Sequence, residues 1–395
     1  MKVTFISNYI NHHQIPLSDE LYKIWGEDYT FIQTEPMEEE RIKMGWVESG
    51  TEIPYVKVYD SDPEGIQKLI DTCDVAIFDG LDDESYIAKR LNEKKIVLRT
   101  WERLYKTGQW KAVSPRGLIK KHHDHTRYSK DRVYLLCYGG YVADDFEIIK
   151  AYRGKRLKWG YFPEFHEFEI KARKAKKEKE IPMVLWAGRM IPWKHGMDAL
   201  KAVKACSEEG LKFRFVMVGN GECEDELKNF VFANHLEETV TFTGALSPKE
   251  VREQMEKADV YLFTSDYEEG WGVVANESMN SGCVLIASHA AGAVPFLVRD
   301  NENGLIYESG NVSQLSECLS RVLKDEALRE RLQDSAYETI KNMWNAHIAA
   351  KRLVKFCEEL QNGMLSFEEE GPLSEAYVIP EKKMYRYLKG EWKCP

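Results

Sequence analysis

Short apolar runs alternate along the chain with longer stretches whose apolar positions recur every three or four residues. In the first half, runs that predict buried strands lie at residues 3–7, 30–33, 56–59, 75–79, 95–99 and 132–137. Helical stretches separate these runs, and the first of them opens near Pro16. Strands that alternate with helices predict a parallel sheet joined by right-handed crossovers.

The second half repeats this plan more regularly. A charged run at 171–180 (K-A-R-K-A-K-K-E-K-E) precedes predicted strands at 183–187, 212–218, 239–243, 260–265 and 283–287, and helices at 196–210, 222–233 and 248–257. The last stretch, 351–395, is helical and mixed, with breaks at Pro372 and Pro380. We therefore expect α/β architecture with two Rossmann-like domains, at 1–165 and 181–345, a charged linker at 166–180, and C-terminal helices at 346–395.

Composition narrows the class of protein. The chain has 395 residues, enough for two domains, and its net charge of −10 argues against nucleic-acid binding. Its eight cysteines are scattered, with no C-x-x-C pair, which predicts reduced thiols rather than a disulfide or zinc framework. The N-terminus is predicted to be a first strand rather than a signal peptide, and no run of about 18 apolar residues is present. These features predict a cytoplasmic location.

Two carboxylates stand out at 269–277, where the sequence is E-G-W-G-V-V-A-N-E. Glu269 follows the predicted strand at 260–265, and Glu277 falls on the helix expected next. Open α/β sheets bind ligands at the carboxyl ends of their strands. A loop that aims N–H groups from a helix start suits a phosphate, and ionised carboxylates accept hydrogen bonds from sugar hydroxyls.

Two cations follow the predicted strand at 183–187, in the motif G-R-M-I-P-W-K-H-G. Arg189 and Lys194 lie five residues apart across a proline turn, so both can reach one diphosphate. The alternative is two solvated cations at a helix start, an arrangement that opposes the helix dipole unless an anion is present.

Three further loops follow predicted strands. V-G-N-G-E contains Gly219 and is favoured as a simple tight turn; F-T-G-A-L-S contains Gly244 and Leu246 and can seat a flat nucleobase on its backbone. For A-A-G-A-V-P at 290–295 a tight connection and a functional loop are equally open. Five loops at one sheet edge, offering cations, N–H groups and two acids, fit a nucleoside diphosphate that carries a sugar.

These motifs, with N-G-L-I-Y further on, resemble the retaining GT-B glycosyltransferases of the large family 4, the glycosyl transferases group 1. The order and spacing agree over about 160 residues, 183–342. The resemblance implies two Rossmann-like domains with parallel sheets facing a central cleft, the first binding the acceptor and the second the donor. It also implies that the C-terminal helices cross back to the first domain.

The resemblance implies a role for each matching residue. Arg189 and Lys194 bind the donor pyrophosphate and stabilise its growing charge, Glu269 holds hydroxyls of the transferred sugar, and Glu277 accepts hydrogen bonds from the ribose. The other nucleotide-sugar contacts are expected from backbone at Gly219, Gly244, Leu246, Gly270, Trp271, Gly272 and Val273.

The first half departs from the family. R-T-W-E-R at 99–103 replaces the region of a frequent histidine, N-H-H-Q replaces a glycine pair, and Phe296 stands where many members have glutamate. On the acceptor or sugar side we expect Asn11, His12, His13 and Glu102. S-N-Y-I-N-H-H-Q-I-P and K-W-G-Y-F-P are similar to bacterial transferases that build surface polysaccharide.

The expected reaction moves a sugar from a nucleotide-diphosphate sugar, with UDP favoured and GDP next, to a glycan or lipid-linked acceptor with retention. No metal or other cofactor is expected. Asp60-Ser61-Asp62 is interpreted as turn chemistry, and the histidines at 122–125 as a solvated or acceptor-facing loop. The alternatives are a sugar phosphorylase, a nucleotide-sugar hydrolase or epimerase on the same fold, and a non-catalytic nucleotide-sugar-binding subunit.

Basic residues cluster in the first domain of this acidic protein, at 116–127 and 150–158. Two interpretations stay open. One is an ordinary solvated face. The other is docking on anionic lipid headgroups, where each basic residue contributes about 1 kcal/mol, which predicts peripheral contact at the inner face of a membrane.

Overall fold

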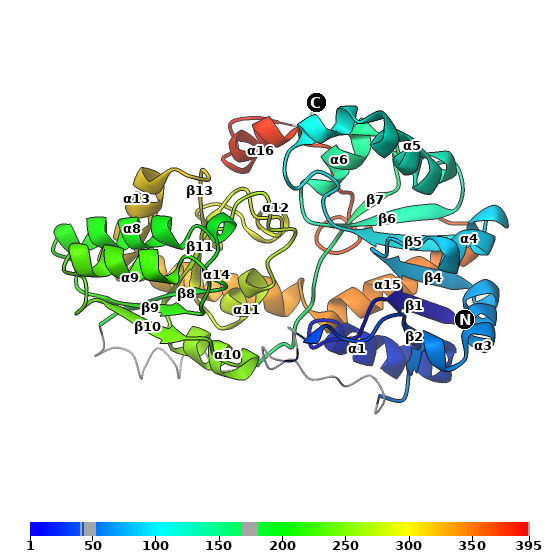
Figure 1. The fold of residues 1–395 in the computed structure, drawn as a ribbon, viewed down its shortest axis with the longest axis horizontal. Helices are drawn as coiled ribbons and strands as arrows, with labels where there is room; N and C mark the ends of the chain where they lie inside the picture. The colour runs from blue at the N-terminus through cyan, green and yellow to red at the C-terminus, as the bar shows by residue number, and fades with distance from the viewer. Residues whose placement is uncertain (40–41, 43–52, 168–180, 394–395) are drawn as a thin grey trace. The chain divides into compact units, whose positions relative to one another are not determined.

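The computed structural model describes residues 1–39, 42, 53–167 and 181–393 (Figure 1). The chain forms two compact units. Unit 1 comprises Met1–Glu164 and Met343–Glu381, and unit 2 comprises Phe165–Asn342 and Lys382–Lys393. Most of the predicted linker, at 168–180, lies outside the described residues. Within the described part of the chain, no helix is long and apolar enough to span a membrane.

Unit 1 is built on a seven-stranded parallel sheet with the strand order β3-β2-β1-β4-β5-β6-β7. Apart from the edge strand β3, its strands run mostly through buried residues, because helices on both faces leave no polar side to a parallel sheet. The order reverses direction between β1 and β4, the kind of point at which open α/β sheets bind ligands. The strands are β1 Val3–Ser7, β2 Tyr29–Gln33, β3 Val56–Val58, β4 Val75–Asp79, β5 Ile96–Trp101, β6 Val133–Tyr138 and β7 Arg156–Trp159.

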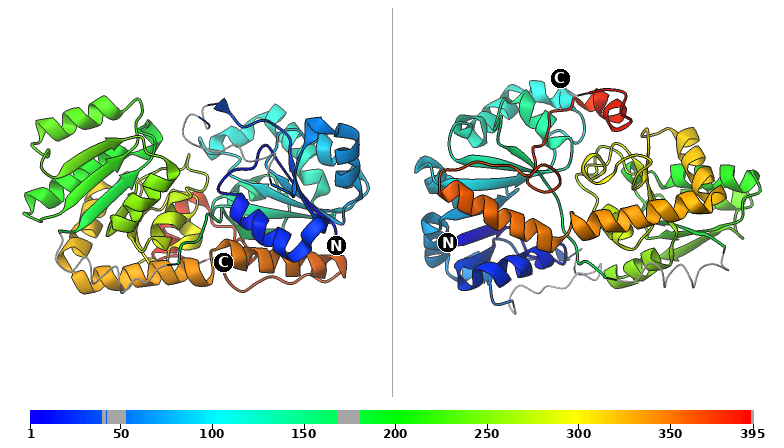
Figure 2. Two further views of the ribbon diagram at one scale, coloured as in Figure 1. Left: turned by 90° about the horizontal axis from the view of Figure 1, so that it is seen from below. Right: turned by 180° about the vertical axis from the view of Figure 1, so that it is seen from behind.

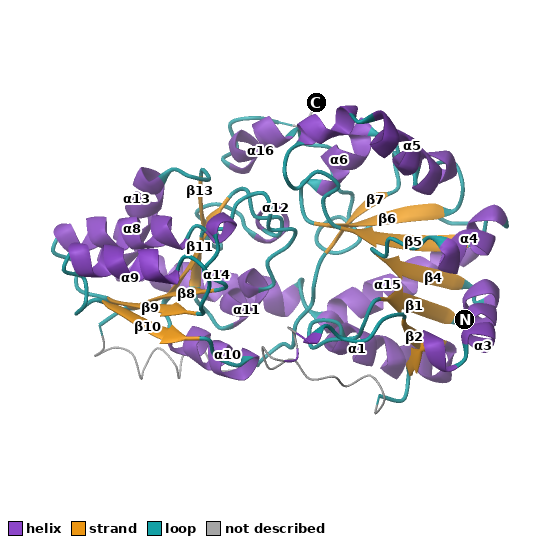
Figure 3. Ribbon diagram, in the orientation of Figure 1, coloured by secondary structure: helices purple, strands orange, loops and turns teal. Residues whose placement is uncertain are grey.

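All but the last of the described helices of unit 1 lie between its strands along the chain, as Figure 3 shows. Pro16 lies in the first turn of the first helix, as expected. The helices are α1 Ile15–Trp25, α3 Pro63–Thr72, α4 Ser85–Asn92, α5 Pro115–Asp124, α6 Val142–Ile148 and α15 Ala346–Gln361, and short 3-10 turns are η1 Gly26–Asp28, η2 Tyr59–Ser61, η3 Gln109–Val113 and η4 Thr126–Tyr128.

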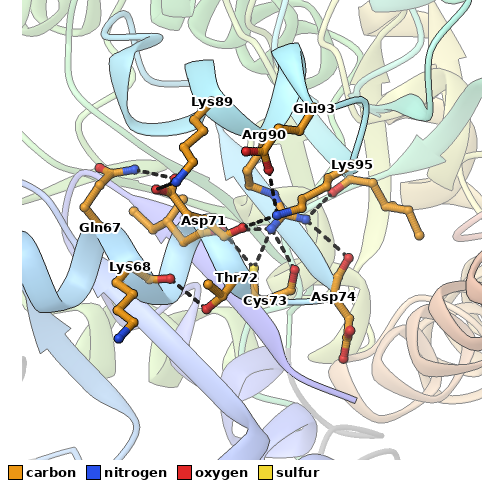
Figure 4. Close-up of polar contacts among 12 residues, drawn as sticks. Gln67, Lys68, Asp71, Thr72, Cys73, Asp74, Lys89, Arg90, Glu93 and Lys95 are labelled. Carbon is orange, nitrogen blue, oxygen red and sulfur yellow. Dashed lines mark hydrogen bonds and ion pairs between the residues drawn. The ribbon is translucent and has the colours of Figure 1, made fainter.

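Arg90, on α4, ties together the end of α3 and the start of β4 (Figure 4). It is fully buried and donates to the carbonyl oxygens of Ile70 at 2.8 Å, Cys73 at 2.7 Å and Ile96 at 2.9 Å. The last carbonyls of a helix have no partner within that helix, so a buried guanidinium satisfies them. This cluster lies at the amino edge of the sheet and stabilises the fold.

Unit 2 contains a six-stranded parallel sheet with the order β10-β9-β8-β11-β12-β13, the same plan as unit 1. Its strands are β8 Met183–Ala187, β9 Arg214–Val218, β10 Val240–Gly244, β11 Val260–Phe263, β12 Val284–Ser288 and β13 Leu305–Tyr307. Its helices are η5 Pro192–Lys194, α8 Gly196–Glu208, α9 Glu224–Ala233, α10 Pro248–Lys257, α11 Val274–Asn280, α12 Val294–Leu297, α13 Val312–Lys324 and α14 Glu326–Asn342.

The C-terminal segment contributes to both units. Helix α15 lies beside α1 in unit 1 (Figure 2), where His347 contacts Glu20 at 2.7 Å. Helix α16, Glu381–Leu388, begins at the boundary between the units, and Lys382–Lys393 group with unit 2. There the Tyr385 hydroxyl donates to Gln314 at 3.0 Å. The expectation had placed all of 346–395 with the first domain.

The predicted α/β class, with two Rossmann-like domains and parallel sheets, is confirmed. Predicted strands and helices of the second half agree with the structure to within about two residues at most ends. Strands β7 and β13 were not predicted, because R-L-K-W alternates apolar with charged residues and L-I-Y is only three residues long.

Candidate functional site

The loops after β8 and β11 lie together at the carboxyl edge of the unit 2 sheet. These two strands are neighbours in the sheet, and side chains and backbone join the loops that follow them. The Asp266 N–H donates to the Trp193 carbonyl at 3.0 Å, and the Thr264 hydroxyl donates to the Lys194 carbonyl at 2.6 Å. The two predicted motifs are therefore one structural element.

Lys194 and Glu269 form an ion pair within this element. Their side chains are mostly buried, with 16% and 12% of their surface exposed, and the Ser265 hydroxyl donates to the same Glu269 oxygen at 2.9 Å. An ammonium group has three N–H donors, so pairing with Glu269 leaves Lys194 able to bind an anion as well. The structure thus brings a predicted phosphate-binding cation into contact with a predicted sugar-binding acid.

Arg189 and Lys194 both lie against the ring of Trp193. The Arg189 guanidinium carbon is 5.9 Å and the Lys194 nitrogen 4.5 Å from the ring centroid, within the range of cation–π attraction. Arg189 is exposed, so its fork of donors is available to a ligand. The two predicted cations therefore lie beside the same indole ring.

His195 joins the same loops and was not predicted. Its backbone is left-handed, with φ +50°, and its imidazole contacts Asp198 at 3.5 Å and Asp266 at 3.0 Å. Hydrogen bonds to Asp198 and then to Asp266 raise the pKa of His195 to about 9, so it is a cation at neutral pH. The spacing of His195 and Asp198, three residues apart at the start of α8, was the sequence signal for this contact.

Glu277 lies on the short helix α11 and is half-buried. Burial raises its pKa to about 7, and the nearby charges of Arg252 and His166 offset that effect only in part. A carboxylate removed from water in this way gains from a ligand that donates hydrogen bonds to it. Its predicted place on a helix is confirmed.

Glycines let the carboxylate loop fold tightly. Gly272 has φ +89°, and a Cβ there would lie 2.2 Å from the Phe263 ring. The side chain of Trp271 is buried and donates to Asn276 at 2.8 Å, so only the backbone of Trp271 remains for a ligand. A Cβ on Gly292 would lie 1.8 Å from the Gly270 carbonyl oxygen, which shows that the 290–295 loop supports the carboxylate loop from behind.

Gly219 and Gly221 support the Arg189 loop in the same way. A Cβ on Gly219 would lie 1.9 Å from the Gly188 carbonyl oxygen, and the Gly219 N–H donates to the Gly244 carbonyl at 2.8 Å. The turn at Gly219 and the turn that contains Gly244 and Leu246 are therefore joined. Close backbone approach accounts for the glycine at position 219, and its predicted contact with a nucleotide stays a prediction.

Unit 1 has a cavity of about 650 Å³ at the carboxyl edge of its own sheet. Three residues predicted for the acceptor or sugar side, Asn11, His13 and Glu102, line it. His12 lies against His13, with ring centroids 3.8 Å apart, and does not line the cavity.

Asp79, at the end of β4, is a half-buried acid of this cavity and was not predicted. It accepts hydrogen bonds from Ser7 at 2.9 Å, from Gln14 at 2.8 Å and from Thr100. Burial raises the pKa of Asp79, and the hydrogen bonds offset this only in part. Its place at the carboxyl end of the strand at 75–79 is the sequence signal for this acid.

Other lining residues of the cavity are aromatic and charged. Tyr161 stacks on Tyr138 with centroids 4.5 Å apart and donates to Glu102 at 3.4 Å, and Glu102 also pairs with Lys106. Arg103 pairs with Asp145 at 3.1 Å. A flat aromatic wall with acids and hydroxyls suits a sugar ring and its hydroxyl groups.

Metal-binding chemistry was expected to be absent. Among the residues with described positions, no group of three or more His, Cys, Asp or Glu is arranged to hold an ion. Asp62 instead caps α3, accepting from the Gly65 N–H at 3.0 Å. His125 is buried with its Nδ1 3.0 Å from Arg99, and burial lowers its pKa well below the usual value.

Comparison with known proteins agrees with this architecture. Residues 167–339, within unit 2, match the family model of glycosyl transferases group 1. The structure of Anabaena Alr3699/HepE in complex with UDP superposes with a TM-score of 0.67 and 15% identity, covering 91% of this chain and 100% of that one. The fold is GT-B. The apo lipopolysaccharide outer core galactosyltransferase WaaB gives a TM-score of 0.64 at 15% identity, over 90% of this chain and 98% of that one.

Curated relatives match over about half of the chain. Alpha-D-kanosaminyltransferase of Streptomyces kanamyceticus is 26% identical over 193 residues, which are 48% of this chain and 50% of that protein. The amylovoran biosynthesis glycosyltransferase AmsK of Erwinia amylovora is 26% identical over 200 residues, 49% of this chain and 48% of that protein. The matched region of the chain thus spans about half the length of these relatives.

Proposed function

We propose that this GT-B protein is a retaining glycosyltransferase that uses a nucleotide-diphosphate sugar and a glycan or lipid-linked acceptor. The Lys194–Glu269 ion pair carries the proposal, because it couples a phosphate-binding cation to a hydroxyl-binding acid at a sheet edge. A hydrolase with two carboxylates has no need of the two cations gathered at Trp193.

In this mechanism, the glycosidic bond breaks and negative charge grows on the leaving diphosphate. Arg189 and Lys194 stabilise that charge from fixed positions, which is the largest contribution such a site makes. Glu269 holds hydroxyls of the transferred sugar, and Glu277 accepts from the ribose. The departing phosphate oxygen takes the acceptor proton, so the reaction requires no separate base, metal or other cofactor.

UDP is the favoured nucleotide, with GDP next. Anabaena Alr3699/HepE, which shares the fold over its whole length, was solved with UDP. A role in bacterial surface-polysaccharide synthesis is consistent with the similarity of about half of the chain to AmsK, which is described as an amylovoran biosynthesis glycosyltransferase. The cavity of unit 1, with Asp79 and Glu102, is the proposed acceptor site.

Nucleotide binding tests this function before any acceptor is known. Thermal unfolding is measured with UDP, GDP, ADP and their sugar conjugates, with and without chelator. A ligand present at a hundred times its dissociation constant stabilises the protein by about 2.7 kcal/mol. We expect one nucleotide to raise the unfolding temperature regardless of chelator, and we expect Glu277→Gln to abolish that shift.

The same variant has a second expected effect. Burial raises the pKa of Glu277 from 4.5 to about 7, so the folded state holds this proton more tightly than the unfolded state. Stability that the carboxyl contributes is therefore lost as pH rises from about 4.5 to 7. Glu277→Gln removes this loss, and the ligand-free variant should be more stable than the wild type at pH 8.

If no nucleotide raises the unfolding temperature of the wild type, that result would contradict the proposed function.

A further inference from the structure

Large apolar side chains are exposed on η3 and α5 of unit 1. Trp110 is 71% exposed, Val113 79%, Leu118 40% and Ile119 71%, all within ten residues of sequence. We call these four residues the 110–119 surface. Single exposed apolar residues are ordinary, but a contiguous group on one segment indicates a contact surface.

Helix α5 does not pack another of its faces into the core of unit 1. None of its ten residues is buried. Its first turn is capped by Ser114, whose hydroxyl accepts from the Gly117 N–H at 3.4 Å, and Pro115 occupies the first position. A helix usually forms by burying an apolar face, so a capped helix without a buried residue has a face left for another partner.

The charge around the 110–119 surface is opposite to that of the whole protein. Residues 104–133 contain eight Lys or Arg and two Asp, whereas the chain carries a net charge of −10. Lys111, Arg116 and Lys120 are exposed among the apolar side chains, and the Lys111 nitrogen lies 5.5 Å from the Trp110 ring centroid. Cations mixed with exposed tryptophan and aliphatic residues are typical of segments that lie at a bilayer surface.

The second basic segment predicted from sequence, 150–158, is used differently. Arg156 is buried and donates to the Ala151 carbonyl at 2.6 Å, and Lys155 donates to the Ser129 carbonyl at 3.1 Å. Lys158 is half-buried, and burial lowers its pKa. Lys150 and Arg153 are exposed, and Arg153 pairs with Glu147. The expectation of one basic surface over both segments therefore holds only in part for 150–158, and more of the exposed cations lie near α5.

We propose that the 110–119 surface docks on an anionic lipid bilayer, with Trp110, Val113 and Ile119 in the interface and Lys111, Arg116 and Lys120 at the headgroups. Burial of the apolar groups and attraction of the cations act together, and each basic residue contributes a factor of about five, the equivalent of about 1 kcal/mol. Neither contribution depends on catalysis.

The docking surface adjoins the unit 1 cavity. Asp82 lines that cavity, and its carboxylate is 3.9 Å from the Lys120 nitrogen of α5. Lys106 lines the cavity too, three residues before η3 begins. If the cavity holds the acceptor, as the proposed function requires, a docked α5 presents it to acceptors anchored in the same bilayer. The proposal therefore selects the lipid-linked class of acceptor.

Co-sedimentation with vesicles tests the docking directly. The full chain is mixed with vesicles of phosphatidylcholine alone and of phosphatidylcholine with phosphatidylglycerol, at low and high salt. We expect binding to the anionic vesicles that weakens as salt rises. Lys111→Gln with Lys120→Gln should weaken it by about 25-fold, and Trp110→Ser with Ile119→Ser by about tenfold or more.

Matched controls separate docking from general charge and exposure. Lys57→Gln with Lys68→Gln removes two exposed cations of unit 1, and Phe232→Ser removes a side chain that is 73% exposed on α9. Both should bind as the wild type does. The nucleotide-induced thermal shift should persist in every docking variant, so failure of docking is distinguishable from failure of the proposed function.

Two results would overturn the proposal. In the first, wild-type protein whose thermal transition shows that it is folded binds equally to neutral and anionic vesicles, or binds to neither. The other is self-association in solution that Trp110→Ser with Ile119→Ser abolishes without any vesicle binding, which would identify a second copy of the chain as the partner.

Discussion

The two sheets have the same strand order, but the groups at their carboxyl edges differ in charge. In unit 2, Arg189 and Lys194 gather at one indole, and His195 adds a third cation held by two aspartates. In unit 1, the half-buried acid Asp79 accepts from neutral donors, and Glu102 faces an aromatic wall. Equivalent positions on one architecture thus suit an anionic diphosphate in one unit and a neutral, hydroxyl-rich molecule in the other.

This difference arises in the loops, since the strands that carry them are equally apolar. The strands β1 and β8 are fully buried, but β1 leads to N-Y-I-N-H-H-Q and β8 to G-R-M-I-P-W-K-H-G. A sheet edge supplies a place for a ligand, and the loop residues decide its charge. Substitutions at the two edges should therefore affect different substrates.

The largest effect is expected at the cationic edge. Arg189→Ala and Lys194→Gln should each lower turnover by two or more orders of magnitude, because one preorganised donor to a growing charge is worth about 3–4 kcal/mol. Glutamine at 194 retains a donor for Glu269, so the fold around the acid is preserved. Steady-state turnover with saturating donor and acceptor is the measurement.

The matched control for these cations is Lys212→Ala, an exposed lysine just before β9. Its turnover and thermal stability should equal those of the wild type. Turnover within threefold of the wild type in both folded site variants would show that the two cations do not stabilise the leaving group.

Sequence predicted the cationic edge better than the acidic one for a physical reason. Arg189 with Lys194, and Glu269 with Glu277, lie in short continuous motifs directly after apolar strands, so strand position alone places them. Asp79 acquires its character from Ser7, which is 72 residues away, and from Thr100, 21 residues further on. Hydrogen bonds between such distant residues depend on strand order, which the pattern of apolar residues does not encode.

His195 and His12 show the same limit at the level of single residues. The pKa of His195 is raised by Asp198, three residues away on α8, and also by Asp266, which is 71 residues away in the sequence. His12 and His13 are adjacent in sequence, and the turn before α1 directs only His13 into the cavity. Spacing alone did not distinguish these cases, whereas the two sheets and most element boundaries followed from periodicity.

A smaller and selective effect is expected at the acidic edge. Asp79→Asn keeps the shape of the side chain but replaces the carboxylate by a neutral amide. The loss of hydrogen bonds to a charged group costs about 1.5–3 kcal/mol. We expect kcat/KM for the acceptor to fall about tenfold to a hundredfold, while the nucleotide-induced thermal shift stays unchanged. The two readouts separate the edges.

Arg90→Met serves as the comparison for Asp79→Asn in unit 1, since Arg90 is buried at the other edge of the same sheet. It should lower thermal stability without changing the KM of the acceptor. Loss of nucleotide binding in Asp79→Asn would mean that the acidic cavity is not a separate acceptor site.

The smallest effect is expected at His195, whose imidazole contacts Asp198 and Asp266. The pKa of about 9 lies above its ordinary value of 6.5, so its stabilising contribution is full below pH 6.5 and is lost as pH rises through 9. His195→Asn tolerates the left-handed backbone but removes the charge. The affinity of the variant for the donor should fall about fivefold at pH 7, which corresponds to about 1 kcal/mol of binding free energy. Nucleotide titration should show that the donor affinity of the wild type declines toward pH 9.5 relative to that of the variant.

His235→Asn is the matched control, because His235 also has a left-handed backbone, with φ +53°, and is exposed. Equal pH profiles for the wild type and His195→Asn would show that the imidazolium does not hold the two loops together.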